Sequence, residues 1–270
     1  MLRTRVLTAL IITLIGVSAL FGLPPLGFAL FAVVVLLVLG GWEASRLAGF
    51  DAIFMRIVLT AGLAAMGAVI LVIDPEDHIT MWLLPVCGLW LVLFAWLRWP
   101  GAGAYRNGLI RAVKWTVLAV VLLGAWLAAT WLQASSPWYV LLLLVIIAAA
   151  DVGAFFCGRH FGGAKLAPRI SPGKTRSGAF GGLISAGLLT ALAAALIPAS
   201  PFSPALAGLL ALALALTSIG GDLFISLLKR QADIKDSSNL LPGHGGILDR
   251  IDSLGSGLPF FALAVALWAQ

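Results

Sequence analysis

The stretch Leu141-Leu-Leu-Leu-Val-Ile-Ile-Ala-Ala-Ala150 is an uninterrupted apolar run, and it ends directly at a carboxylate, Asp151. With its flanks it reaches about 20 residues, the length that a helix needs to cross a bilayer. A segment in lipid must satisfy its backbone hydrogen bonds internally, which favours a helix. The run therefore predicts a transmembrane helix over about residues 137–157.

The composition of the whole chain agrees with a membrane setting. The 270 residues are 61% hydrophobic and 10% charged, whereas a soluble domain is about 25% charged. So little polar material cannot cover a globular surface, which excludes a soluble fold. The formal net charge of +6 is typical of basic cytoplasmic loops, and we expect no nucleic-acid partner. The two cysteines, Cys87 and Cys157, lie in apolar segments and are expected to serve packing.

The apolar runs predict an all-α, polytopic membrane protein with about nine transmembrane helices. A short interfacial helix is expected over 42–50. No secure internal repeat is found; residues 1–136 are expected to be a transmembrane scaffold, and 137–270 the catalytic region. The nine predicted spans cover about 5–23, 24–41, 54–73, 80–97, 113–133, 137–157, 177–198, 203–228 and 253–270.

Charge parity predicts the orientation of these spans. All seventeen Lys and Arg residues fall at the N-terminus or in loops after even-numbered spans. The other loops, including the acidic segment 74–78, contain none. The positive-inside rule then predicts a cytoplasmic N-terminus and an outside C-terminus in the cell (inner) membrane. Residues 1–22 could instead be a cleaved signal peptide, and we favour a retained span because its apolar run is long.

The densest charge lies in Gly221–Asp252, which holds five of the eleven carboxylates and four of the seventeen basic residues. Asp222 and Ser226 stand at i and i+4 on one helix face, with Lys229 and Arg230 following. Asp249 and Asp252 share a face in the same way. Carboxylate and hydroxyl oxygens converging from two elements suit Mg²⁺.

Glycine-rich and basic loops accompany these acids. Gly243, Gly245 and Gly246 flank His244 and allow backbone N–H groups to approach an anion. The loop 158–178 carries five basic residues and no acid, which indicates either phosphate binding or ordinary cytoplasmic charge bias. A P-loop is excluded because Pro168 occupies the position of its first glycine. Asp151 either faces the polar cavity or reaches the headgroup layer.

These features predict a membrane enzyme that transfers phosphoryl or nucleotidyl groups to a lipid phosphate. The order of the motifs closely resembles the phosphatidate cytidylyltransferase family, also called CDP-diacylglycerol synthases, over about residues 150–253. The strongest match is Ser226-x-x-Lys229-Arg230-x4-Lys235-Asp236-x5-Pro242-Gly-His-Gly-Gly-x-x-Asp249-Arg250-x-Asp252. Asp151-x-Gly-Ala-Phe155 and Ser171-Pro-Gly-Lys-Thr175 resemble its other blocks. Arg176, Ser177 and Phe155 depart from the usual pattern and bear on substrate preference more than on reaction class.

The resemblance implies the reaction of CTP with phosphatidate to give CDP-diacylglycerol and pyrophosphate, in the cytoplasmic leaflet, with Mg²⁺ and a neighbouring K⁺. Asp222 and Asp249 are expected to bind the metal, assisted by Ser226 or Asp252. The residues expected at the catalytic centre are Asp222, Asp249, Asp252, Lys229, Arg230, Lys235, Asp236 and His244. The residues expected to bind substrate are Asp151, Ser171, Lys174, Thr175, Arg176, Ser226, Gly243, Gly245, Gly246 and Arg250.

Three other hypotheses stay open at this stage. The same chemistry could act on an isoprenoid ether-lipid phosphate, because no residue distinguishes acyl from isoprenoid chains. A transporter would carry ionisable groups at mid-bilayer depth, whereas here they lie near the cytoplasmic ends of the spans. A lipid-binding relative without activity is disfavoured by the intact Asp222, Asp249 and Asp252. The sequence leaves the oligomeric state open, with a homodimer as one alternative.

Overall fold

The structure, a computed structural model, describes residues 2–73, 78–104, 107–196 and 202–268. The acidic segment 74–77, Arg106 and the link 197–201 lie outside the described residues. Within them, nine helices are long and apolar enough to cross a membrane, which confirms the all-α polytopic prediction. The elements are α1 (Leu2–Gly22), α2 (Pro25–Ala32), the π-helix η1 (Val33–Leu39), α3 (Gly40–Leu47), α4 (Ile53–Ile73), α5 (Ile79–Trp96), α6 (Gly108–Ser135), α7 (Pro137–Phe161), β1 (Lys165–Ala167), β2 (Ser171–Thr175), α8 (Arg176–Leu196), α9 (Pro204–Gln231) and α10 (Leu248–Trp268).

Several helices begin where the sequence supplies a start signal. Pro25, Pro137 and Pro204 stand in the first turns of α2, α7 and α9, where the missing proline N–H costs no hydrogen bond. The side chain of Asn107 accepts a hydrogen bond from Ile110 N at the start of α6. Ser203 does the same for Leu206 N before α9. Such caps satisfy N–H groups that have no partner inside the helix.

The second span is longer than predicted at its C-terminal end, where it continues to Leu47 instead of ending near residue 41. Elements α2, η1 and α3 form one continuous helix over Pro25–Leu47. The prediction of a short interfacial helix over 42–50 is therefore wrong. Gly40 approaches Leu122 and Gly41 approaches Leu63, so the absence of side chains lets the helix pack inside the bundle. Glu43 is completely buried there.

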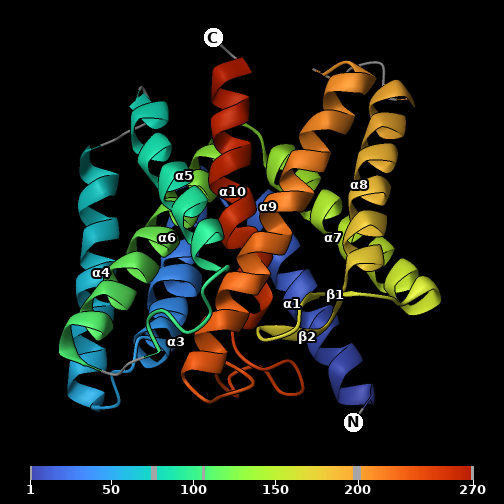
Figure 1. Cartoon of the computed structure of the whole chain (residues 1–270). Coiled ribbons are helices and arrows are strands. Elements are labelled where there is room, and N and C mark those ends of the chain that lie inside the picture. The colour runs from blue at the N-terminus through green and yellow to red at the C-terminus, as the bar shows by residue number, and fades with distance from the viewer. Residues whose placement is uncertain (1, 74–77, 105–106, 197–201, 269–270) are drawn as a thin grey trace.

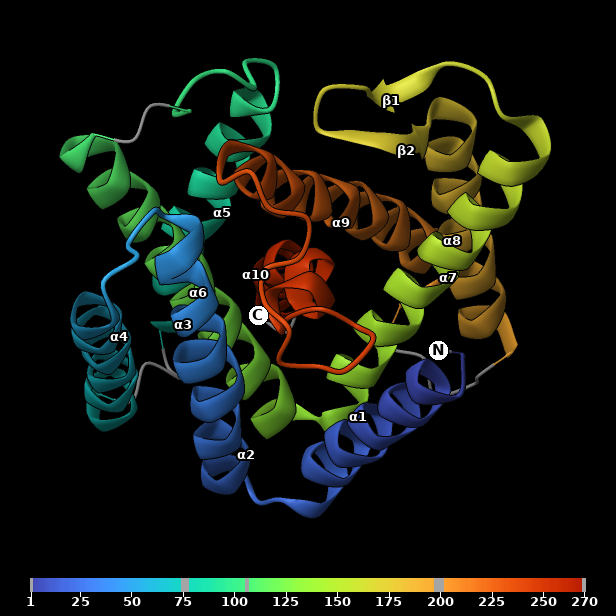
Figure 2. The ribbon, with the colours of Figure 1, turned by 90° about the horizontal axis from the view of Figure 1, so that it is seen from below.

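Helix α10 runs through the middle of the bundle and is surrounded by the other helices (Figure 2). Its Phe261 is fully buried, as are Trp90 of α5, Trp126 of α6 and Phe224 of α9. Helix α8 lies against α7, where glycines permit a close approach: a Cβ on Gly182 would stand 2.7 Å from Ala150 O. Small residues at such contacts are the usual means of packing helices in lipid.

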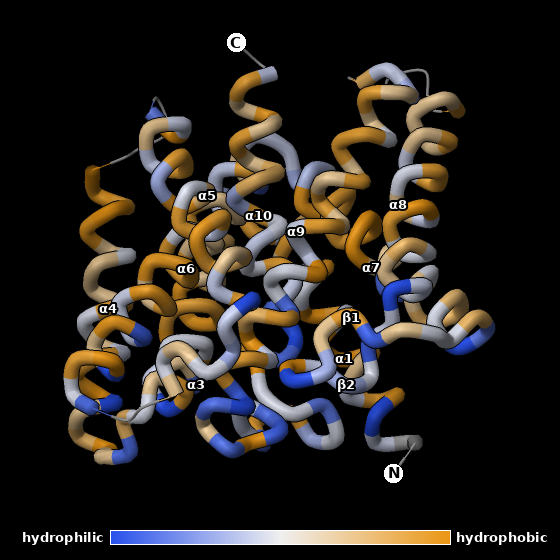
Figure 3. Tube along the Cα trace, in the orientation of Figure 1, coloured by the Kyte–Doolittle hydropathy of each residue, from blue (hydrophilic) through white to orange (hydrophobic). Residues whose placement is uncertain are grey.

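Polar residues gather at one end of the bundle (Figure 3). The strands β1 and β2, the loop between α9 and α10, and the N-terminal end of α1 all lie at this end, while the C-terminal end of α10 lies at the other (Figure 1). The arrangement brings the two charged regions that the sequence singled out to the same end of the molecule.

Candidate active site

The predicted basic loop forms an antiparallel hairpin rather than an irregular loop. Strand β1 pairs with β2 in a register that places Lys165 opposite Thr175. The hairpin is fastened to α9, because Arg230 Nε donates a hydrogen bond to Ile170 O at 3.2 Å. Ile170 also packs on Leu223 and Leu227. These contacts fix Lys174 beside the acidic face of α9.

Lys174 and Asp222 form the first ion pair of the site. Both side chains are partly exposed, at 30% and 27%. Ser226 Oγ donates a hydrogen bond to Asp222 Oδ1 at 3.2 Å, as the i, i+4 spacing predicts. Asp222 therefore has one oxygen engaged by Ser226 of its own helix and the other by Lys174 of the hairpin.

A cavity of about 440 Å³ opens beside this pair. Asp151, Arg159 and Lys174 supply charge to its lining, and Thr175 supplies a hydroxyl. Most of the remaining lining is apolar and comes from α7, α8 and α9, including Phe155, which is largely exposed. A cavity with a charged patch and an apolar wall suits an amphiphilic ligand, one with an anionic head and a hydrocarbon tail.

Asp252 brings α10 to the same place. Its carboxylate interacts electrostatically with Asp222, Lys229 and Lys174. The two helices approach closely because a Cβ on Gly221 would stand only 2.5 Å from Asp252 O. The predicted convergence of acids from two elements is confirmed for Asp222 and Asp252.

Asp249 lies in a second, more buried ion pair. Its Oδ1 accepts from Lys229 Nζ at 2.6 Å, and its side chain is 5% exposed. Its Oδ2 accepts hydrogen bonds from Ser237 N at 2.8 Å and Gly246 N at 3.0 Å, and it lies 3.0 Å from Ser237 Oγ, whose single proton it shares with Glu43. Asp249 thus ties the loop before α10 to the end of α9.

The glycine cluster is required by this loop. Gly243 and Gly245 have φ values of +77° and +80°, which side chains disfavour. A Cβ on Gly246 would collide with Ser237 Oγ and with both carboxylate oxygens of Glu43. His244 N donates to Leu241 O at 2.9 Å, so the N–H groups of His244 and Gly246 are engaged inside the protein. Triphosphate binding by this backbone stays a prediction.

Some of the remaining predicted residues make structural contacts around the site, and others are exposed near it. Thr175 Oγ1 accepts a hydrogen bond from Gly178 N and caps α8. Asp236 lies beside Gly245, and His244 Nδ1 is buried without a hydrogen-bond partner. Ser171 is half-buried in β2, whereas Arg176, Arg230, Lys235, Asp236 and Arg250 are exposed.

Sequence reasoning missed three residues that touch the loop from the N-terminal half. Glu43 of α3 accepts hydrogen bonds from the loop and from the start of α10. Thr8 Oγ1 of α1 donates to Pro242 O at 3.1 Å, and Arg5 packs against Gly243. The signal available for Glu43 was its charge directly after an apolar run, since an unpaired carboxylate there is costly.

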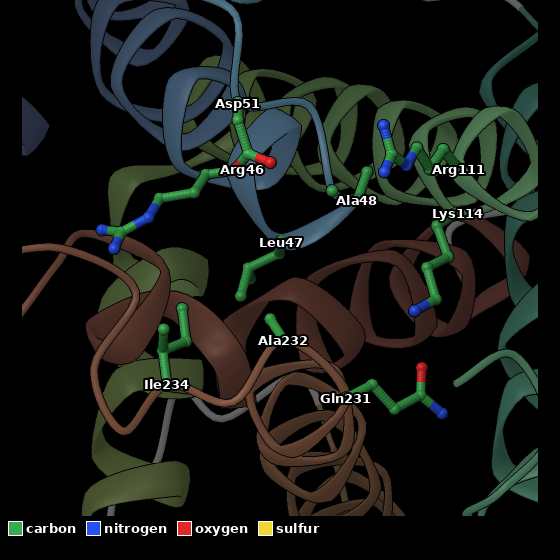
Figure 4. Close-up of a pocket in the computed structure, with 10 residues that line it drawn as sticks. Arg46, Leu47, Ala48, Asp51, Arg111, Lys114, Gln231, Ala232 and Ile234 are labelled. Atoms are coloured by element: carbon green, nitrogen blue, oxygen red, sulfur yellow. The ribbon is translucent and has the colours of Figure 1, made fainter. Parts of the chain in front are cut away.

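A second cavity of about 110 Å³ lies at the C-terminal end of α9 (Figure 4). Lys114 and Arg111 of α6, Arg46 of α3 and Gln231 of α9 contribute to its lining, together with Asp51. The catalytic-centre residues predicted from the sequence are not among its lining residues. This cavity is therefore separate from the 440 Å³ cavity.

The oxygen donors of the site suit a hard cation. Asp222, Ser226 and Asp252 present carboxylate and hydroxyl oxygens, which are the ligands that Mg²⁺ prefers. Over the described ranges, no three His, Cys, Asp or Glu side chains are grouped closely enough to hold a metal together. Asp222 and Asp249 are each engaged by a lysine ammonium instead. Magnesium binding and the neighbouring potassium ion stay predictions.

The fold and the site define a polytopic membrane protein with paired lysines and carboxylates beside an amphiphilic cavity. The chain belongs to the cytidylyltransferase family, which it matches over residues 3–268. It is 40% identical to the phosphatidate cytidylyltransferase of Pseudomonas aeruginosa, over 100% of this chain and 98% of the relative. It is 34% identical to that of Haemophilus influenzae, over 97% and 98% of the two chains.

Proposed function

We propose that this protein condenses CTP with phosphatidate to form CDP-diacylglycerol and pyrophosphate, as a step of phospholipid biosynthesis. The full-length likeness to phosphatidate cytidylyltransferases supports the reaction class. The observation that carries the proposal in the structure is the 440 Å³ cavity, whose apolar wall adjoins Lys174 and Asp151. A lipid phosphate has the matching chemistry, with a dianionic head and hydrocarbon chains.

In this reaction an oxygen of the lipid phosphate attacks the α-phosphorus of CTP. The bond from that phosphorus to the bridging oxygen breaks, and pyrophosphate leaves with the electron pair. The attacking phosphate is already an anion, so no strong general base is required, and His244 is not assigned as one. The protein's task is to hold two anions together and to neutralise their charge.

Two lysines have the positive charge that this task needs. Lys174 lies at the cavity and Lys229 beside Asp249, each paired with a carboxylate. We assign the lipid phosphate to Lys174 and the triphosphate to Lys229, with Arg176 and Arg230 as exposed basic neighbours. As the substrates enter, each ammonium can exchange its carboxylate for a phosphate oxygen. This frees the oxygens of Asp222 and Asp249.

Mg²⁺, when bound, would neutralise negative charge on the phosphates and orient them. Asp222, Ser226 and Asp252 are the residues proposed to hold it, with Asp249 as a further ligand. The proposed location is the cell membrane, with the polar end in the cytoplasm where CTP is found. This orientation is supported by the placement of all seventeen Lys and Arg residues on one side of the predicted spans.

The decisive experiment is an assay of purified protein in mixed micelles with labelled CTP. Phosphatidate and an unsaturated isoprenoid ether-lipid phosphate are supplied separately, each with a Mg²⁺ titration. We expect Mg²⁺-dependent labelled lipid and pyrophosphate with phosphatidate. Turnover of the ether lipid alone would reassign the substrate. Absence of CTP-dependent product with both lipids would contradict the proposal. A cooperative thermal unfolding transition establishes that the assayed protein is folded.

A further inference from the structure

Glu43 is a fully buried carboxylate that the proposed reaction does not use directly. Oε1 accepts hydrogen bonds from Ser238 Oγ at 2.5 Å and Ile247 N at 2.9 Å. Oε2 accepts from Ser237 Oγ and Leu248 N, both at 2.8 Å. Three donors, together with the Ser237 hydroxyl proton that Glu43 shares with Asp249, thus satisfy one buried charge, which would otherwise be strongly unfavourable in this position.

These donors belong to the segment that carries Asp249. Ile247 N and Leu248 N stand at the start of α10, where N–H groups have no partner within the helix and a negative charge is favourable. Glu43 therefore caps α10 from a different helix, 204 residues away in sequence from Ile247. The two serines belong to the loop that leads from α9 to α10.

Glu43 and Asp249 both accept hydrogen bonds from the loop between α9 and α10. Ser237 Oγ lies 2.8 Å from Glu43 Oε2 and 3.0 Å from Asp249 Oδ2. Gly246 fits between them, because any Cβ there would collide with Glu43 and Ser237. The position of Asp249 relative to Lys229 therefore depends on where Glu43 holds the loop.

We propose that Glu43 is a positioning residue for the nucleotide half of the site. It holds Ser237, Ser238 and the start of α10 so that Asp249 faces Lys229. The inference rests on the proposed role of Asp249 in binding the CTP triphosphate and its metal. It assigns no such role to Glu43 for the lipid, because Glu43 is not among the lining residues of the 440 Å³ cavity and the carboxylate paired with Lys174 is that of Asp222.

The test compares Glu43→Gln, which keeps the size of the side chain, with wild type in the micelle assay. A glutamine offers one acceptor oxygen and presents an NH₂ group to donors that Glu43 now satisfies. We expect KM for CTP and the Mg²⁺ concentration for half-maximal activity to rise by about 10-fold or more, as for outer-shell partners of metal sites. KM for phosphatidate should change by less than about twofold on the same grounds.

Ser45→Ala is the matched control. Ser45 is also fully buried on α3, but its hydroxyl donates to Trp42 O and accepts from Arg56 Nε, not from the loop. This variant should lower the unfolding temperature without moving KM for CTP. Ser238→Ala removes one donor to Glu43, and the Glu43→Gln, Ser238→Ala double variant should raise KM for CTP by less than the product of the single effects.

A purely structural role makes a different prediction, in which Glu43→Gln lowers the yield of active protein while the remaining enzyme keeps wild-type KM values. That result would overturn the inference. A thermal-shift titration with CTP and Mg²⁺ but without lipid should show weaker protection of Glu43→Gln than of Ser45→Ala. This binding measurement does not depend on the lipid, so a failure of the proposed lipid chemistry is distinguishable from a failure of the positioning role.

Discussion

Lys174 of the hairpin is ion-paired with Asp222 of α9, so two segments that the sequence separates by a whole span meet at one point. The pair stands at the edge of the cavity that also contains Asp151. A cation and an acid held together in this way neutralise each other until substrates arrive. The pair therefore connects the 440 Å³ cavity to the acids of α9 and α10.

Lys174→Ala is expected to lower kcat/KM by about 100-fold, because a charged donor to a reacting phosphate acts in a partly dehydrated site. The measurement is labelled CDP-lipid formed from labelled CTP. Lys165→Ala is the control, since Lys165 is an exposed lysine on the other strand; it should change the rate by less than about threefold, as for other exposed charges. An equal loss in both variants would show that hairpin charge, and not the position of Lys174, is what matters.

Asp249→Asn should reduce CTP-dependent product formation by about 10³-fold, because the amide cannot replace the charge beside Lys229. Membrane insertion, followed by membrane fractionation, should be unchanged. The control is Asp233→Asn: Asp233 is exposed and has a φ of +56°, a conformation that asparagine tolerates. Wild-type turnover by Asp249→Asn would remove Asp249 from the metal and triphosphate site.

Gly246→Ala should destabilise the protein by about 1–3 kcal/mol, the cost of forcing a methyl group into a filled space. It should also lower activity, because Glu43 and Ser237 must move away to admit the methyl group. Thermal unfolding and the CTP assay measure the two effects. Gly88→Ala in α5 is the control, since a Cβ there meets nothing within 4 Å, and an unchanged Gly246→Ala protein would contradict the packing argument.

Thr8→Val should raise KM for CTP by about two- to fivefold, because one hydrogen bond to Pro242 is lost. The contact joins α1 to the glycine loop at 3.1 Å. Thr4→Val, one turn earlier on the same helix, is the control and should leave KM unchanged. Equal effects of the two substitutions would indicate a general perturbation of α1.

Reporter fusions test the proposed orientation. Alkaline phosphatase fused after Gln270 should be active, because the C-terminus is predicted outside. Green fluorescent protein fused after Asp236, in the loop between α9 and α10, should fluoresce because that loop is predicted in the cytoplasm. The reverse pattern would place the active site on the outer face.

The nine spans could be predicted because hydrophobic length is a local property of the chain. The pairing of Asp222 with Ser226 was predictable for the same reason, since both lie on one helix face. The proximity of Asp222 to Asp252 was predictable because one loop joins the charged end of α9 to the charged start of α10, and the structure confirms it. Local pattern and motif spacing thus predicted the acidic centre of the site.

The residues that surround Asp222 and Asp252 are held by contacts between segments that are distant in sequence. Thr175 lines the cavity, as a substrate-binding residue would, and its hydroxyl also caps α8, a role that depends on where the helix begins. The backbone pairing that makes the hairpin is not indicated by the sequence of a basic loop. The sequence placed Glu43 in an interfacial helix. The residues that bond to its carboxylate lie at the other end of the chain and could not be identified from the sequence around it. No local pattern in residues 40–47 indicates that donors from another segment satisfy it.

The π-helix η1 affects which chimeras between this protein and its relatives can be active. Residues Val33–Leu39 carry wider turns than an α-helix, and such a turn holds an additional residue. Deleting one residue there would convert the wide turn to an α-helical turn and keep the rotation of the helix after it, whereas deleting one residue from a regular α-helical turn of this span would rotate everything that follows by about 100° around the helix axis. In the second case Glu43 would face away from Ser237, even though no atom near the acids had been altered. Chimeras that join the first two spans of one relative to the last spans of another should therefore work only when the helical register of the second span is kept.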